Sequence, residues 1–277
     1  MKENELRVVR EFLEEAEAIL VTAGAGMGVD SGLPDFRGTE GFWRAYPPLA
    51  KLGLRFEEMA DPRWFEEDPG LAWAFYGHRL HLYRRTVPHA GFERLKKAIA
   101  KKGGNGFVFT SNVDGQFQKA GFGESGVYEV HGSIHHLQCL HDCRGRVWPN
   151  TEEIPIDEER FRALHLPRCP DCGGLARPNI LMFGDWGWNP SRSEAQARRF
   201  EAWLEANRSR KLAILEFGAG TAIPTVRRQG EVLAASFPAA RLIRINPREP
   251  QIDSRLGWGL AMGALEATEA LKIAEGQ

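Results

Sequence analysis

ILVTAGAGMGVDSGLPDFRG, residues 19–38, is the stretch from which the fold can be worked out. Its opening apolar triplet, which begins at Ile19, is too short for a helix and suits a buried strand. Gly24, Gly26 and Gly28 follow, where the backbone must be free to turn or must let a ligand approach closely. A strand that runs into a glycine-rich turn is a common frame for binding phosphate through backbone N–H groups. The spacing G-x-G-x-G meets the dinucleotide-binding pattern only in part, so a plain turn remains an equal alternative.

The composition indicates a globular protein of one large domain, or of one domain with an insertion. The 277 residues are 43% hydrophobic and 26% charged, and the net charge is −1. This balance gives no reason to expect bulk electrostatic binding to nucleic acid or to a membrane surface. The sequence has no run of about 18 apolar residues, and its N-terminus reads as a charged amphipathic helix and not as a secretory signal. We therefore expect a cytoplasmic protein with neither membrane nor direct nucleic-acid partners.

Short apolar runs alternate with helical patterns along the rest of the chain. We expect helices over about 5–18, 70–85, 89–102, 191–207, 226–235 and 262–273. We expect further strands at 107–109, 127–130, 212–217 and 241–245, with residues 177–185 re-entering the main sheet. Ser191 is expected to cap the helix that follows it. Prolines and aromatic residues after Gly38 indicate a set of short helices. The alternation predicts an α/β fold with a doubly wound parallel sheet.

Polar groups stand just after several of the expected strands. The sequence TSNVD occupies residues 110–114, and His131-Gly132 follows the next strand. Open α/β sheets place their ligand sites at the carboxyl ends of parallel strands. A lone histidine is more often structural than catalytic, but the glycine beside it and the parallel with Asn112 favour a function for His131.

The four cysteines form two closely spaced pairs. Cys139 and Cys143 are separated by 25 residues from Cys169 and Cys172. Two such knuckles suit tetrahedral zinc, and four reduced buried thiols are the alternative. Four sulfurs would fill every position, so His141 is not needed as a ligand and the metal would be structural. The segment predicts a small zinc-ribbon module.

Several separated segments resemble the sirtuin family. Residues 24–38 resemble the signature GAGxSxxSGIPDFRG, and residues 110–114 resemble TQNID. His131-Gly132 is similar to the family's catalytic His-Gly, and the cysteine pairs match its zinc module. Residues 177–185 resemble RPxVVxFGE, residues 218–220 stand where the family has GTS, and Asn246 matches an asparagine that ends a later strand. The segments keep the family's order along nearly the whole chain.

The resemblance implies an NAD-dependent protein-lysine deacylase of bacterial type, which releases nicotinamide and O-acyl-ADP-ribose. It implies a Rossmann-type NAD-binding domain of residues 1–40, 88–134 and 183–277. It also implies a helical insertion at 41–87 and a zinc-binding domain at 135–182. NAD would lie between the large domain and the zinc domain, one structural zinc would be bound per chain, and an acylated protein lysine would be the partner.

The resemblance also implies roles for individual residues. His131 would be the general base that activates a ribose hydroxyl, with Asn112 as a second catalytic residue. Asp35, Phe36 and Arg37 would lie on a loop that closes over NAD. The other NAD-binding positions would be Ala23, Gly24, Ala25, Gly26, Ser111, Val113, Asp114, Gly218, Ala219, Gly220, Asn246 and Pro247. Phe183 and Gly184 would pair with the substrate peptide as an added strand.

This chain departs from the family pattern at several of these positions. Gly28 and Ser111 replace a serine and a glutamine, and Ala219-Gly220 replaces Thr-Ser. Asp185 replaces a glutamate, and the bulky Trp186 follows it. Much of NAD binding depends on backbone and loop geometry, so we expect it to survive, whereas the deacylation rate and the peptide groove are expected to change.

Tyr76 and Arg79 form a Tyr-x-x-Arg pair like that of sirtuins that prefer acidic acyl groups such as succinyl. The two residues are one helical turn apart, where both could bind a carboxylate. The alternative is an ordinary surface pair. Two other functions are compatible with the same NAD site, an ADP-ribosyltransferase and a catalytically weak NAD sensor. The presence of His131 argues against the sensor.

Overall fold

The structure, a computed structural model, describes residues 3–35 and 38–274. Its centre is a six-stranded sheet in the order β11-β10-β9-β1-β2-β3. The strands are β1 (Ala18–Ala23), β2 (Gly106–Thr110), β3 (Val127–Glu129), β9 (Leu212–Phe217), β10 (Ala240–Ile245) and β11 (Gly257–Leu260). Each pairs in parallel with its neighbours. The prediction of a doubly wound parallel sheet is confirmed.

The strand order reverses at β1, which pairs with β2 on one side and β9 on the other. The last residue of β1, Ala23, is in register with Thr110 at the end of β2 and with Phe217 at the end of β9. The turns that leave these three strands therefore meet at one edge of the sheet. In an open α/β sheet this reversal point is where a crevice for a ligand forms.

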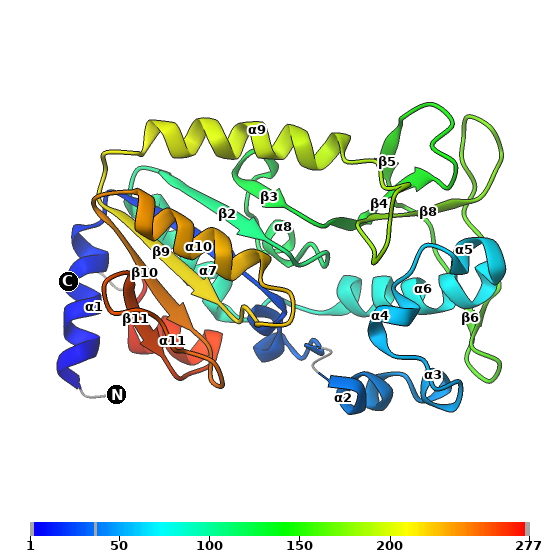
Figure 1. The fold of residues 1–277 in the computed structure, drawn as a ribbon, viewed down its shortest axis with the longest axis horizontal. Helices are drawn as coiled ribbons and strands as arrows, with labels where there is room; N and C mark the ends of the chain where they lie inside the picture. Colours follow the sequence, from blue (N-terminus) through cyan, green and yellow to red (C-terminus); the bar gives the residue numbers. More distant parts are fainter. Residues whose placement is uncertain (1–2, 36–37, 275–277) are drawn as a thin grey trace.

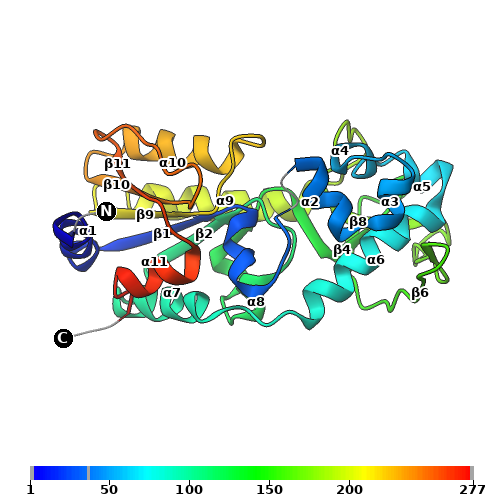
Figure 2. The ribbon, with the colours of Figure 1, turned by 90° about the horizontal axis from the view of Figure 1, so that it is seen from below.

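Helices cover both faces of the sheet (Figures 1 and 2). On one face pack α1 (Glu3–Glu15), α7 (Ala90–Lys101), α11 (Ala264–Ala270) and the 3-10 helix η1 (Ala25–Ser31). On the other lie α9 (Ser191–Ala206) and α10 (Thr225–Ser236). Ile19 and Val21 point into the first of these cores and Leu20 into the second, so β1 is buried on both sides. This explains its continuous apolar run.

The remaining chain forms a second lobe beside the sheet (Figure 1). It contains five helices: α2 (Gly38–Ala45), α3 (Pro47–Lys51), α4 (Phe56–Met59), α5 (Trp64–Glu67) and α6 (Pro69–Arg85). It also contains a three-stranded sheet of β5 (Val147–Pro149), β4 (Gly132–Cys139) and β8 (Ala176–Ile180), and a hairpin of β6 (Ile156–Asp157) and β7 (Arg162–Ala163). One shared hydrophobic core joins the helices to these strands. Trp73 of α6, for example, donates a hydrogen bond of 3.0 Å to the carbonyl of Ala176.

Some sequence-based expectations about elements are wrong. Residues 176–180 form β8, which pairs antiparallel with β4 and does not re-enter the main sheet. The edge strand β11 was not expected. Ser191 is the first helical residue of α9 and not its cap; instead, its N–H donates to Oδ1 of Asn189 at 3.0 Å. The short elements α8 (Gln116–Lys119) and η2 (Glu124–Gly126) complete the large lobe.

The helices of this structure differ from membrane-spanning helices in length or in hydropathy. Among residues 3–35 and 38–274, none of them is both long and apolar enough to cross a membrane.

Candidate functional site

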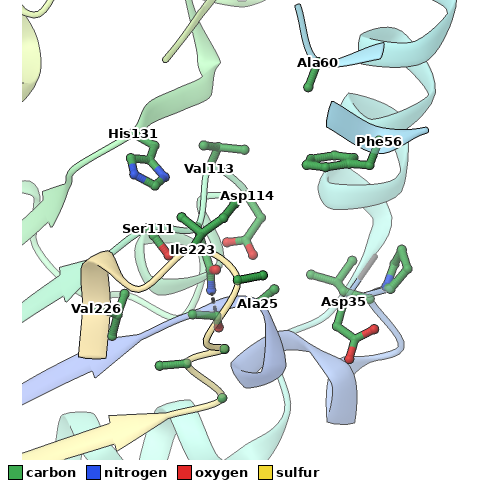
Figure 3. Close-up of a pocket in the computed structure, with 18 of the residues that line it drawn as sticks. Ala25, Asp35, Phe56, Ala60, Ser111, Val113, Asp114, His131, Ile223 and Val226 are labelled. Atoms are coloured by element: carbon green, nitrogen blue, oxygen red, sulfur yellow. Dashed lines mark hydrogen bonds between the residues drawn. The ribbon is translucent and has the colours of Figure 1, made fainter. Parts of the chain in front are cut away.

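A cavity of about 700 Å³ lies at the carboxyl edge of the large sheet, between the sheet and the second lobe. Figure 3 shows His131, Ser111 and Asp114 on the sheet side, with Phe56 and Ala60 of the second lobe facing them. The sequence-predicted site residues that line this cavity are Gly24, Ala25, Asp35, Tyr76, Arg79, Ser111, Asn112, Val113, Asp114, His131, Phe183, Gly218, Ala219 and Gly220.

Five predicted residues are not among the lining. Ala23, Gly26, Gly184, Asn246 and Pro247 lie beside the lining segments in sequence without facing the cavity. Their assignment as ligand-contacting residues stays a prediction.

The prediction for Phe36 and Arg37 falls outside the described residues. Pro34, which the resemblance places on the loop that closes over NAD, also lines the cavity. The lining further includes residues that sequence reasoning missed, which are Leu33, Phe56, Glu57, Ala60, Tyr83, Ile180, Leu181, Met182, Thr221, Ala222, Ile223, Val226, Arg248 and Glu249. Most of these are apolar or come from the second lobe. Leu33, Ile180, Leu181 and Met182 lie inside the motifs at residues 24–38 and 177–185, which could have indicated them, whereas no motif covers the others.

The glycine turn after β1 packs directly on the glycine turn after β9. Gly26 donates its N–H to the carbonyl of Gly218 at 3.1 Å. A Cβ at Gly26 would lie 2.6 Å from Cα of Gly218, closer than real Cβ atoms approach. Gly218 also has a positive φ of 57°, which favours glycine. Gly26 and Gly218 are therefore required by the contact of two backbones, and the neighbouring Gly24 and Ala25 line the cavity.

Two asparagines hold the turns in place. The Asn112 side chain donates to the carbonyl of Gly24 at 3.0 Å, and its own N–H donates to Oγ1 of Thr110. On the other side of β1, the Asn246 side chain donates to the carbonyl of Ala219 at 2.9 Å. Both amides thus stabilise the cavity floor from the ends of β2 and β10. A ligand role for them stays a prediction.

The His131 imidazole has a lowered pKa, which favours its neutral form. Its side chain lies at the end of β3, and burial holds its pKa below the ordinary value, while a hydrogen bond with the Ser111 backbone acts in the opposite direction. A neutral imidazole can accept a proton, which is what a general base requires. Asp114 lies nearby in the same cavity, and burial raises its pKa to about 6 although the N–H of Gln116 donates to it at 2.9 Å.

Tyr76 and Arg79 are buried in the cavity wall, so an ordinary surface pair is excluded. The Tyr76 hydroxyl is buried and finds no hydrogen-bond partner among the described residues. Burial raises its pKa to about 12, so the phenol stays protonated and can donate. The Arg79 guanidinium donates through Nε and Nη2 to the Tyr83 hydroxyl at 3.1 and 2.9 Å. It also lies within 5.3–5.8 Å of four aromatic ring centroids. This end of the cavity is therefore aromatic and carries one buried cation and one buried donor.

The segment after β8 forms another part of the wall. The N–H of Leu181 donates to the carbonyl of His131 at 3.0 Å, and that of Phe183 donates to the carbonyl of Ala60 at 2.9 Å. The Phe183 N–H is thus already used, which leaves its carbonyl for the predicted pairing with a peptide. Asp185, which replaces the family's glutamate, is buried in an ion pair with Arg177.

Gly28 is buried against Leu33, which lines the cavity. A Cβ at Gly28 would lie 3.0 Å from Cδ1 of Leu33 and 3.3 Å from its Cβ. A serine here, as in the family pattern, would require the Leu33 side chain to shift by a few tenths of an ångström. Because Gly28 has no side chain, Leu33 packs closer to the backbone at this position than a serine would allow.

The four cysteines converge at one end of the three-stranded sheet. Their Sγ atoms all lie within 4.8 Å of one another, with 3.7 Å between Cys139 and Cys172 and 3.6 Å between Cys143 and Cys169. All four are free thiols. Tetrahedral zinc with Zn–S bonds of about 2.3 Å requires sulfurs about 3.8 Å apart, so the arrangement fits a closed structural zinc site.

Comparisons with known proteins agree with this geometry. A family model described as "Sir2 family" matches residues 24–199. The NAD-dependent protein deacylase of Aquifex aeolicus is 30% identical over 84% of this chain and 85% of its own length. The NAD-dependent protein deacylase of Thermus thermophilus is 29% identical over 96% of this chain and 93% of its own. The mitochondrial NAD-dependent protein deacylase sirtuin-5 of Danio rerio is 31% identical over 66% of this chain and 62% of its own length.

Solved structures show the same fold. A Sir2 enzyme structure superposes with a TM-score of 0.69 and 26% identity over 98% of this chain and 99% of its own. A Sir2 homologue in complex with NAD superposes with a TM-score of 0.68 and 23% identity over 96% of this chain and 92% of its own.

Proposed function

The chain belongs to the Sir2 family, and we propose from this membership that it is an NAD-dependent protein-lysine deacylase. The reaction consumes NAD, water and an acyl-lysine, and it releases nicotinamide, lysine and O-acyl-ADP-ribose. The observation that carries the proposal is one cavity in which the two glycine turns, the half-buried His131 with its lowered pKa, and the aromatic pocket of Tyr76 and Arg79 come together.

NAD fits the cavity as a substrate in a defined direction. The glycine turns after β1 and β9 lie at the reversal point of the sheet, where a pyrophosphate can approach the backbone of Gly24 and Ala25. The nicotinamide half would then lie over β2 and β3, beside Ser111 and Asp114, and the adenosine half over β9 and β10. When bound, NAD supplies a ribose carbon that the acyl oxygen attacks as nicotinamide leaves.

His131 then acts as the general base. Its burial keeps it neutral near pH 7, so it can take the proton of a ribose hydroxyl. Asn112 fixes the neighbouring turn through its bond to Gly24. The apolar wall that includes Val113 and Phe56 limits the access of water to the reacting groups.

The acyl pocket favours a carboxylate. The Tyr76 hydroxyl is a buried donor without a partner among the described residues, and the Arg79 guanidinium lies one helical turn away in the same wall. A hydroxyl and a guanidinium together suit a terminal carboxylate such as that of a succinyl group. We therefore propose acidic acyl-lysines as the preferred substrate class.

Nicotinamide release from acetyl-, succinyl- and long-acyl-lysine peptides tests the activity. We expect release to require both NAD and an acyl peptide and to be fastest with the succinyl peptide. Removal of a general base typically costs roughly 10²–10⁴-fold, so His131→Ala should lose about that much rate. Thermal unfolding of His131→Ala without ligand serves as the control for folding. Peptide-independent nicotinamide release with ADP-ribose attached to protein would instead establish the ADP-ribosyltransferase alternative.

Three further proposals complete this function. The zinc held by the cysteines is structural and fixes the ends of β4 and β8. The partner is an acylated protein lysine, without membrane or direct nucleic-acid binding. The location is the cytoplasm.

A further inference from the structure

Trp186 is the most exposed large apolar side chain among the described residues. Its exposed fraction is 99%, so the whole indole lies in solvent. An exposed indole loses the burial energy that a tryptophan usually contributes, and aromatic side chains of this kind are common anchors in interfaces. The role proposed for the cavity makes no use of Trp186.

The loop that carries Trp186 is fixed by hydrogen bonds to buried side chains. The Asp185 carboxylate accepts hydrogen bonds from the Arg177 guanidinium, from the N–H of Met182 at 3.2 Å and from the N–H of Gly187 at 3.1 Å. Gln138 of β4 donates its side-chain amide to the carbonyl of Gly187 at 2.8 Å. Both residues that flank Trp186 are therefore fixed, and the indole is presented without a large loss of loop entropy on binding.

This loop continues the wall of the cavity. Phe183 lines the cavity three residues before Trp186, and its ring lies 6.2 Å from that of Phe56 in an edge-on arrangement. Fully extended backbone spans at most about 3.6 Å per residue, so the backbone of Trp186 lies within roughly 11 Å of that of Phe183, which lines the cavity. A polypeptide whose acyl-lysine enters the cavity would pass within reach of the indole.

The segment that packs against Phe183 is acidic. Residues 55–68, which include α4 and α5, hold six carboxylates and two arginines. Glu57 follows Phe56, is exposed and lines the cavity. Within the described part of the chain, Glu57, Glu66 and Glu67 form no ion pair, whereas Glu58 and Asp61 pair with the two arginines. This part of the cavity surroundings therefore combines an exposed indole with an excess of negative charge, although Arg55 lies close enough to Glu57 to interact with it electrostatically.

We infer that Trp186 is a specificity-determining residue that binds an arginine or lysine side chain flanking the acyl-lysine of the substrate, with Glu57 adding charge complementarity. This inference rests on the proposed deacylase function. A cation over an indole gains about 0.5–1 kcal/mol at exposed sites, which corresponds to roughly 2- to 5-fold in affinity. The carboxylate supplies a further attraction that salt weakens.

Direct binding tests the inference without relying on turnover. Two fluorescent peptides with the same acyl-lysine carry either arginine or glutamine on both sides, and anisotropy gives their dissociation constants. We expect the chain to bind the arginine peptide roughly 2- to 5-fold more tightly, or better. Trp186→Ala should abolish this preference, and Trp186→Phe should keep most of it. Glu57→Gln should reduce the preference and its salt dependence.

Leu164→Ala is the matched control, because Leu164 is 69% exposed and lies after β7, outside the cavity lining. It should leave the preference unchanged, and thermal unfolding should show that Trp186→Ala folds normally. Equal affinity of the unaltered chain for the two peptides would overturn the inference, and so would a full preference in Trp186→Ala. The proposed function is tested by a different measurement, nicotinamide release, and it would be refuted if the chain turned over no acyl peptide.

Discussion

Replacement of Tyr76 by phenylalanine should change stability and activity in opposite directions. The Tyr76 hydroxyl is fully buried and has no hydrogen-bond partner in the described structure. Such a group costs about 1–3 kcal/mol, because its bonds to water are lost on folding and are not replaced. Tyr76 is one of the residues that line the cavity, so we take the lower end of that range.

Tyr76→Phe should therefore raise the free energy of unfolding by about 1 kcal/mol. For a chain of this length a change of about 1 kcal/mol corresponds to about 2 °C in Tm. In contrast, a hydrogen bond to a charged group is worth about 1.5–3 kcal/mol. Loss of the hydroxyl should thus lower kcat/KM for a succinyl-lysine peptide by roughly 10- to 100-fold. An acetyl-lysine peptide has no carboxylate, so its kcat/KM should change less than about 2-fold.

Thermal unfolding without ligands and nicotinamide release with the two peptides measure these effects. Tyr83→Phe is the contrasting variant, because the Tyr83 hydroxyl accepts two hydrogen bonds from Arg79. Its removal leaves buried guanidinium donors without that acceptor and should lower Tm. A Tyr76→Phe variant that is less stable than the unaltered chain would refute the reasoning about the unpaired hydroxyl. Equal losses with succinyl and acetyl peptides would refute the carboxylate pocket.

Three further predictions concern the cavity floor, its buried acid and the zinc site. Gly26→Ala would place a Cβ 2.6 Å from Cα of Gly218, so it should cost about 1–3 kcal/mol of stability and weaken NAD binding in calorimetry. Gly187→Ala, whose Cβ would meet nothing closer than 3.9 Å, should do neither, and equal effects would contradict the packing argument. The Asp114 pKa of about 6 lies above its unfolded value of about 3.9, so its stabilising contribution is complete below about pH 4 and is lost as the pH rises past 6. At about pH 7.5, urea denaturation should accordingly give Asp114→Asn a free energy of unfolding higher than that of the unaltered chain by on the order of 2 kcal/mol. If this advantage of Asp114→Asn grew towards acid pH, the raised pKa of Asp114 would be refuted. Metal analysis should find about one zinc per chain, and chelation should unfold the segment around Cys139 and Cys172; less than about half a zinc per chain would count against the site.

Sequence patterns predict an element correctly where the local pattern of residues and the packing of the folded chain favour the same structure. The strand at residues 212–217 was predicted with the bounds that the structure shows, because its apolar run is buried on both faces. Helices α6 and α7 were predicted to within a residue or two at each end. The zinc site followed from the cysteine spacing, since tetrahedral coordination leaves few other arrangements.

Other elements depend on partners that no pattern contains. The edge strand β11 has two glycines among four residues, and it is a strand only because β10 offers it hydrogen bonds. Residues 176–180 look like a strand of the main sheet, but pairing with β4 assigns them to the small sheet. Helix α9 begins at Ser191, one residue earlier than a cap at Ser191 would allow, and Asn189, two residues before it, accepts its N–H.

The sequence by itself determined the parallel sheet, the glycine turn after β1, the cysteine knuckles and the candidate base His131. These depend on periodicity, spacing and residue type, which are local properties of the chain. Only the tertiary structure decided that Gly26 must be small because another backbone touches it, and that Tyr76 and Arg79 are buried and not exposed. It also showed Trp186 to be exposed above a rigid loop. Burial and contact are set by segments far apart along the chain, so the chain must fold before either can be known.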